Sequence, residues 1–117
     1  MCSVTTCRSF VTTTLESDLF ENEINRTPNA QLVDVRTPEE YVAGHLPESI
    51  LINVKAESFD SLIQQLDKSR PVFVYCRTGR RSLEAANILE KNKFKIVYNL
   101  EGGIIAWQNK GKATVSN

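Results

Sequence analysis

Short apolar runs recur along the chain, and longer segments with helical spacing of apolar positions separate them. Four of these runs are rich in β-branched residues: 32–35 (LVDV), 50–54 (ILINV), 72–75 (VFVY) and 95–98 (KIVY). Runs of this length and composition are typical of strands that are buried on both faces of a parallel sheet. The pattern therefore predicts a mainly parallel central sheet.

Helical patterns lie between and around these runs. In the segment 80–92 (RRSLEAANILEKN), Ala85, Ile88 and Leu89 share one face, and two lysines near the end favour a helix C-terminus. Apolar residues at 59, 62, 63 and 66 indicate another helix, for which Ser58 is available as the N-cap. A further amphipathic helix is expected over 17–25.

The segment 37–44 (TPEEYVAG) has the signature of a short capped helix. Thr37 is placed to cap it, Pro38 takes the first helical position, Glu40 completes a capping box, and Gly44 ends it. The alternation of strands and helices predicts an α/β domain with a sheet of about five strands and helices on both faces. In such sheets ligands bind beyond the carboxyl ends of the strands.

The length of 117 residues suits one domain. We expect a flexible N-terminal tail at 1–10, the domain at 11–111 and a C-terminal tail at 112–117. The first segment lacks the apolar stretch of a secretory signal, and no run approaches the ~20 residues that span a bilayer. Fourteen cationic and fourteen anionic residues cancel, so neither nucleic acid nor a membrane is expected as a partner.

Cysteine usage points to a reducing compartment. Cys2, Cys7 and Cys76 make an odd count without the spacing of a disulfide framework, although a bridge between Cys2 and Cys7 stays open. The chain has one histidine and no C-x-x-C pair, so no metal or cofactor is expected. We expect a cytoplasmic protein.

The segment CRTGRRS (76–82) gathers three arginines behind one thiol in a chain of zero net charge. A strand, a tight loop and a helix N-terminus together form a cradle for anions, because loop amides and the first helical N–H groups point inward. Gly79 allows the backbone to curl there. Cations and a helix N-terminus lower the pKa of a cysteine, so the arginines are expected to stabilise a Cys76 thiolate and attract an anionic substrate. The alternative is a small buried cysteine beside a solvated helix start.

This segment resembles the six-residue active-site loop of rhodanese-family sulfurtransferases. The segment 32–54 resembles the family's N-terminal signature, and 97–111 (VYNLEGGIIAWQNKG) resembles its C-terminal signature, so the resemblance covers about residues 11–111. The chain differs from the family pattern at Glu48 and Ser49, where a glycine and a small apolar residue are usual. It also differs at Lys55, where a proline often follows the strand. The resemblance implies a single-domain rhodanese-like fold and transfer of sulfane sulfur from thiosulfate or a persulfide donor to a thiol or cyanide.

The resemblance also assigns roles to individual residues. Cys76 is expected to be the nucleophile that carries the sulfur as a persulfide, held by the amides of the loop. Arg77 is expected to bind the donor sulfonate, and Arg81 to turn back and pair with Asp34. The loop comprises Cys76, Arg77, Thr78, Gly79, Arg80 and Arg81, with Asp34 and Arg36 as supporting residues.

Other candidate residues are interpreted as structural. His45 could form a dyad with the cysteine, but the resemblance places it in a structural turn. Trp107 and the pair Gly102 and Gly103 are expected to serve core packing and backbone geometry. A small anionic sulfur donor and a thiol or thioredoxin-like acceptor are the expected partners.

Two alternative functions stay open. One is a small cysteine-loop phosphatase or arsenate reductase, which would need a loop one residue longer to surround a tetrahedral oxyanion. The other is a non-catalytic rhodanese-like interaction module, against which the intact Cys76 and its cationic loop count.

Overall fold

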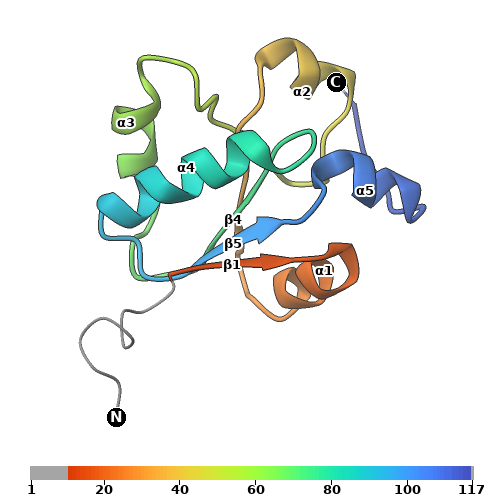
Figure 1. Ribbon diagram of the computed structural model, residues 1–117, viewed down its shortest axis with the longest axis horizontal. Helices are drawn as coiled ribbons and strands as arrows, with labels where there is room; N and C mark the ends of the chain where they lie inside the picture. Colours follow the sequence, from red (N-terminus) through yellow and green to blue (C-terminus); the bar gives the residue numbers. More distant parts are fainter. Residues whose placement is uncertain (1–10, 117) are drawn as a thin grey trace.

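The computed structural model describes residues 11–116, in which five strands alternate with helices (Figure 1). The strands are β1 (Thr12–Leu15), β2 (Gln31–Asp34), β3 (Ile50–Leu51), β4 (Val72–Tyr75) and β5 (Val97–Leu100). The helices are α1 (Ser17–Asn25), α2 (Pro38–Ala43), α3 (Phe59–Leu62), the 3₁₀ helix η1 (Ile63–Gln65), α4 (Arg80–Lys91) and α5 (Gly103–Asn109). The predicted α/β class is confirmed.

The strands form one sheet in the order β1-β5-β4-β2-β3, and every neighbouring pair is parallel. The predicted parallel sheet is therefore confirmed. The central strand β4 is buried along its whole length, as its uninterrupted apolar sequence requires. Cys76 follows its last residue, at the carboxyl edge of the sheet.

Side chains of β4 alternate between two hydrophobic clusters, one on each face of the sheet. Val72 and Val74 belong to a cluster that α3, η1 and α4 complete, and this cluster also contains Cys76. Phe73 and Tyr75 belong to the opposite cluster, which α1 and α5 complete. In Figure 1, α3 and α4 lie above the strands and α1 lies below them. Helices cover both faces, as predicted.

The capping signals identified in the sequence are present in the structure. The Thr37 side chain accepts from the Glu40 N–H, and the Glu40 carboxylate accepts from the Thr37 N–H, so the capping box is complete. Gly44 ends α2, as predicted. The boundaries of α4 agree with the predicted helix to one residue. By contrast, Ser58 forms no side-chain cap, and the helix after it is short and tightens into η1.

Three strands differ from the prediction. The edge strand β1 was not foreseen because three of its four residues are threonines, which leave no apolar run. β3 is limited to Ile50–Leu51, because the chain turns where the Asn53 carbonyl accepts from the Ala56 N–H. β5 begins at Val97, two residues later than expected, so that its register matches Val72.

The structure describes only one of the two segments that we expected to be tails. The expected tail at 1–10 lies outside the described residues. Residues 112–116 lie against the domain: Val115 forms an antiparallel bridge with His45, and the Trp107 Nε1–H donates to the Ala113 carbonyl over 2.8 Å. Within residues 11–116 no helix has the length and apolar character needed to cross a membrane.

Candidate active site

Cys76 lies at the carboxyl end of β4 with its thiol enclosed by the following loop. The residue is only 1% exposed. The Gly79 N–H donates to Cys76 Sγ over 3.0 Å, and Ser82 Oγ lies 3.5 Å from the same sulfur. The predicted cradle is therefore present, and Ser82 belongs to it although the sequence did not single it out.

Two opposing influences set the pKa of the Cys76 thiol. Burial raises it, but hydrogen bonds from the Ser82 hydroxyl and from the backbone N–H groups of Ser82, Gly79 and Thr78 together outweigh burial. The net effect lowers the pKa of Cys76 below its ordinary value. The main stabilisation of the thiolate therefore comes from hydrogen bonds, whereas the sequence suggested the arginine charges.

Helix α5 holds the loop from outside. The N–H groups of Ile104 and Ile105 donate to the carbonyls of Cys76 and Arg77 over 2.9 and 3.2 Å. Gly103, with a φ of 61°, allows this approach, because a Cβ on it would lie 2.6 Å from the Cys76 carbonyl oxygen. Gly79 also needs the left-handed region, with a φ of 109°. The loop carbonyls thus point toward α5, while the Gly79 N–H faces the sulfur.

The three arginines of the loop have different surroundings. Arg77 and Arg80 are exposed, and neither forms an ion pair with another residue of the 11–116 range. Arg81 forms a two-point ion pair with Glu40, over 2.8 and 3.0 Å. The predicted pairing of Arg81 with Asp34 is therefore wrong, because a nearer cation already occupies the Asp34 carboxylate.

That cation is Arg36. Its guanidinium donates to both Asp34 oxygens, over 2.9 Å and 2.6 Å, and also to the Gly44 carbonyl. Asp34 is fully buried, so the pair is a structural one. It fixes the end of β2 beside the end of β4.

Tyr75 extends this buried network, which sequence reasoning missed. Its hydroxyl donates to Asp34 Oδ2 over 2.7 Å and accepts from the Leu46 N–H over 2.9 Å, and Ser49 Oγ lies 3.1 Å away. Burial and the Asp34 carboxylate raise the pKa of Tyr75, so the hydroxyl stays protonated. Asp34, Leu46 and Ser49 therefore anchor Tyr75, the residue that precedes Cys76.

Comparison with known proteins agrees with this geometry. The family model described as "Rhodanese-like domain" matches residues 16–110. The chain belongs to the rhodanese-like family. A protein named "Sulfurtransferase" from Allochromatium vinosum is 32% identical over 102 residues, which cover 87% of this chain and 94% of that protein.

Solved structures of rhodanese-like proteins share the fold. A rhodanese-like domain protein from Staphylococcus aureus superposes with a TM-score of 0.76 at 27% identity, covering 90% of this chain and 98% of that one. The polysulfide-sulfur transferase homodimer from Wolinella succinogenes has a TM-score of 0.72 at 27% identity, covering 91% of this chain and 80% of that one. These rhodanese-like relatives confirm the family that the three sequence signatures indicated.

The departures from the family pattern have visible consequences. Glu48 takes the left-handed conformation, with a φ of 67°, at the position where the resemblance described above leads us to expect glycine. This conformation costs a residue with a Cβ about 1 kcal/mol. Ser49 is buried and donates to the Leu46 carbonyl over 2.7 Å, so it serves the Tyr75 network. Lys55 pairs with Glu84 over 3.0 Å at the surface.

His45 has contacts that assign it to the turn. Its Nδ1 lies 2.7 Å from the Tyr41 carbonyl, and its ring stacks on the Tyr41 ring at 3.7 Å between centroids. No hydrogen bond joins it to Cys76 in the described part of the chain. Among residues 11–116, no group of His, Cys, Asp and Glu side chains is arranged to hold a metal ion.

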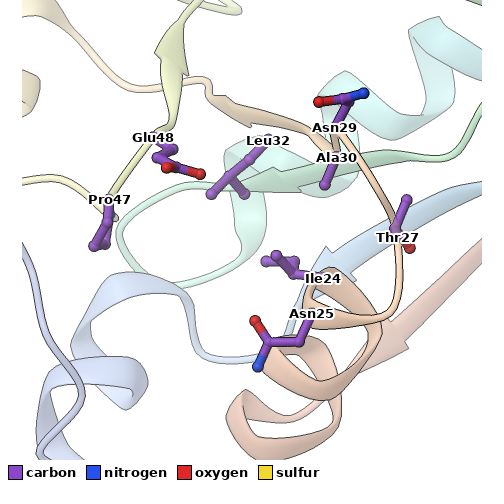
Figure 2. A pocket seen from close by; sticks show the side chains of 8 residues that line it. All are labelled: Ile24, Asn25, Thr27, Asn29, Ala30, Leu32, Pro47 and Glu48. Atoms are coloured by element: carbon purple, nitrogen blue, oxygen red, sulfur yellow. The ribbon is translucent and has the colours of Figure 1, made fainter.

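Two hollows differ in their position relative to the Cys76 loop. A hollow of about 230 Å³ at the carboxyl edge of the sheet is lined by Arg77, Gln108 and residues of α2. A larger one, of about 560 Å³, lies between the end of α1 and the turn at Pro47 and Glu48 (Figure 2). Leu32 lines the larger hollow and packs in the cluster opposite to Cys76, so this hollow is separate from the thiol.

The ion pair between Arg81 and Glu40 yields a prediction about stability. Hydrogen bonding to Arg81 lowers the pKa of Glu40 to about 2 from its usual 4.5. Since the folded state favours the carboxylate, the pair stabilises the fold fully above the usual pKa and loses this contribution as the pH falls toward about 2. Arg81→Ala should therefore lower the free energy of unfolding by about 1 kcal/mol at pH 7.

Urea unfolding at pH 7 and pH 3 measures this effect. The difference between Arg81→Ala and the wild type should shrink at pH 3. Arg80→Ala is the matched control for stability, because Arg80 is exposed and forms no ion pair with another residue of the 11–116 range. Equal stability of the wild type and Arg81→Ala at pH 7 would contradict the assigned pair.

The hydroxyl of Ser82 carries a second prediction. Ser82→Ala removes one of the hydrogen bonds that oppose burial, so the pKa of Cys76 should rise and less thiolate should form at neutral pH. The pH dependence of the alkylation rate by iodoacetamide measures this shift. Ser61→Ala, at an exposed position on α3, is the control, and a profile of Ser82→Ala that coincides with it would refute the role of the hydroxyl.

Proposed function

We propose that the protein is a sulfurtransferase that carries sulfane sulfur as a persulfide on Cys76, with thiosulfate or another persulfide as the donor. The observation that carries this proposal is the enclosed thiol, whose sulfur accepts from the Gly79 N–H over 3.0 Å and has a lowered pKa. A thiolate is the nucleophilic form of cysteine, and the lowered pKa of Cys76 raises the fraction of thiolate at neutral pH. The Allochromatium relative's name and the family membership support the same class of reaction.

In the first half-reaction, the Cys76 thiolate attacks the outer sulfur of thiosulfate. A bond forms between Sγ and that sulfur, the sulfur–sulfur bond of thiosulfate breaks, and sulfite leaves with the electron pair. Arg77 is an exposed residue of the loop and is placed to attract the dianionic donor. The loop N–H groups then stabilise the terminal charge of the persulfide, as donors in an oxyanion hole do.

In the second half-reaction, an acceptor nucleophile attacks the outer sulfur of the persulfide. The bond between the two sulfurs breaks, and its electron pair returns to Cys76 Sγ as the thiolate. A thiol, a thioredoxin-like protein or cyanide can serve as this nucleophile, because each needs access to a single sulfur. The three cysteines make an odd count without the spacing of a disulfide framework, which fits a reducing compartment, so the cytoplasm is the location that we propose.

Intact-protein mass spectrometry before and after incubation with thiosulfate tests the proposal. The mass should increase by one sulfur atom, and a thiol reductant should remove this addition. Cys76→Ser should show no increase under the same conditions. No increase in the wild type, or the same increase in Cys76→Ser, would overturn the proposal.

The length of the loop leads us to expect no phosphatase activity. Arg81 lies five positions after Cys76, one fewer than in the C-x5-R loops that surround phosphate, and its guanidinium is held by Glu40. A phosphate bound at Cys76 would therefore lack the planar cation that grips its oxygens. We expect thiosulfate-dependent sulfur transfer and no measurable hydrolysis of aryl phosphates. Phosphate release that depends on Cys76 and matches the rate of sulfur transfer would favour the phosphatase alternative.

A further inference from the structure

A second hollow lies beside the Cys76 loop, against the carboxyl ends of β1 and β5. Its volume is about 340 Å³, near the lower end of the ~300–1,000 Å³ range of small-molecule sites. Gly79 lines it, and the N–H of the same residue lies 3.0 Å from Cys76 Sγ. The other residues that line it include Thr14, Thr78, Arg80, Leu83, Asn99 and Glu101. Gly79 therefore belongs both to the hollow and to the loop that encloses the sulfur.

Asn99, one of the residues that line this hollow, has an unsatisfied polar atom. The residue is 1% exposed, and its Oδ1 has no hydrogen-bond partner among the described residues. Its Nδ2 donates only a long bond, of 3.4 Å, to Thr14 Oγ1. A buried amide oxygen without a donor costs about 1–3 kcal/mol, so native structures seldom retain one without a use. A ligand that offers an N–H group would satisfy it.

Opposite charges flank the same hollow. Arg80 and Glu101 are both exposed, and neither forms an ion pair within the described part of the chain. A ligand carboxylate can pair with the Arg80 guanidinium, and a ligand ammonium can pair with the Glu101 carboxylate and donate to Asn99 Oδ1. Leu83, which is 46% exposed, offers an apolar side to a short aliphatic stem. These groups together match an α-amino acid.

We propose that this hollow binds the amino-acid headgroup of a small thiol and thereby selects a zwitterionic thiol as the acceptor of sulfur. The inference rests on the proposed sulfurtransferase function, because the thiol acts on the Cys76 persulfide. The acceptor thiolate attacks the outer sulfur, a new sulfur–sulfur bond forms on the acceptor, and the Cys76 Sγ leaves as the thiolate. The proton of the acceptor thiol goes to solvent, so the step needs no oxidant or reductant.

Four acceptors distinguish the parts of the headgroup. L-Cysteine has both charges, cysteamine lacks the carboxylate, 3-mercaptopropionate lacks the ammonium, and 2-mercaptoethanol lacks both. With transfer rates compared at equal thiolate concentration, L-cysteine should have a KM about tenfold below that of 2-mercaptoethanol, the size expected for one charged hydrogen bond. The two singly charged thiols should fall between them. Equal KM values for all four would overturn the inference.

Variants of Asn99 and Glu101 test the site directly. Asn99→Leu, of similar shape, and Glu101→Gln should each raise the KM for L-cysteine about tenfold and leave both the KM for 2-mercaptoethanol and persulfide formation from thiosulfate unchanged. Glu57→Gln, at an exposed position outside the hollow, is the matched control. Asn99→Leu should also keep or raise the melting temperature, because it removes an unsatisfied buried group. A lower melting temperature with an unchanged KM would assign Asn99 to the fold and overturn its role in binding.

A binding measurement separates this inference from the proposed function. S-Methyl-L-cysteine cannot accept sulfur, so calorimetric titration of this probe into Cys76→Ser reports the site alone. We expect binding that Glu101→Gln weakens about tenfold. Binding of the probe without any sulfur transfer by the wild type would refute the sulfurtransferase function and retain an amino-acid site. Sulfur transfer without binding of the probe would refute the site and retain the function.

Discussion

Replacing Cys76 with serine should abolish the transfer of sulfur from thiosulfate to cyanide or a thiol. Serine keeps the size of the side chain, but its hydroxyl does not ionise at neutral pH and cannot form a persulfide. Cys76 is the only cysteine among residues 11–116, and the Gly79 N–H and the Ser82 hydroxyl contact its sulfur, so no other residue in this range can carry the sulfur in its place. Activity should fall to the uncatalysed rate, as measured by thiocyanate formation from thiosulfate and cyanide.

The two remaining cysteines provide the control for this experiment. Cys2→Ser and Cys7→Ser should keep most of the activity, because neither belongs to the sequence signatures of the family. The far-ultraviolet circular dichroism of Cys76→Ser should match that of the wild type, which excludes unfolding as the cause. Equal loss of activity in all three variants would sink the assignment of Cys76 as the nucleophile.

Gly103→Ala should have the largest effect on stability. The added Cβ would overlap the Arg77 carbonyl and lie 2.6 Å from the Cys76 carbonyl oxygen, so α5 and the loop would have to separate. We expect a loss of at least ~3 kcal/mol in the free energy of unfolding, because steric overlap with backbone has no side-chain relief. Sulfur transfer should fall with it, since the loop loses its outer support.

Gly111→Ala is the matched control for this substitution. Gly111 also has a positive φ, of 77°, but a Cβ on it would meet nothing within 4 Å. Its substitution should therefore show only the cost of the left-handed conformation, about 1 kcal/mol. Denaturant unfolding of both variants separates the two contributions. Similar losses in both would show that the packing of α5 on the loop contributes little.

The sequence predicts best those elements whose signal is local. The strand at Val72–Tyr75 is an unbroken β-branched and aromatic run, and the capping box of Thr37 and Glu40 needs only four residues. Both agree with the structure. β1 is different, because its threonines take a strand conformation through pairing with β5. A short stretch of sequence does not reveal which distant segment it pairs with.

The candidate site follows the same rule. The loop from Cys76 to Arg81 could be located from its spacing, but the partner of Arg81 could not, because both Asp34 and Glu40 were available carboxylates. Asp34 is neutralised by Arg36 two residues along the chain, which leaves Glu40 for Arg81. Ser82 was equally hidden, because its contact with Cys76 depends on the turn that Gly79 makes before α4 begins.

The docking of α5 on the loop also bears on how much the site must rearrange during turnover. The peptide groups of Cys76 and Arg77 are fixed from behind by the N–H groups of Ile104 and Ile105, so their dipoles keep one orientation whatever the sulfur carries. A solvent-exposed thiol would have to reorient water each time its charge moved outward by one sulfur atom. Here the peptide dipoles are already oriented by folding, so in the proposed reaction we expect the protein to alternate between thiolate and persulfide with an almost unchanged backbone.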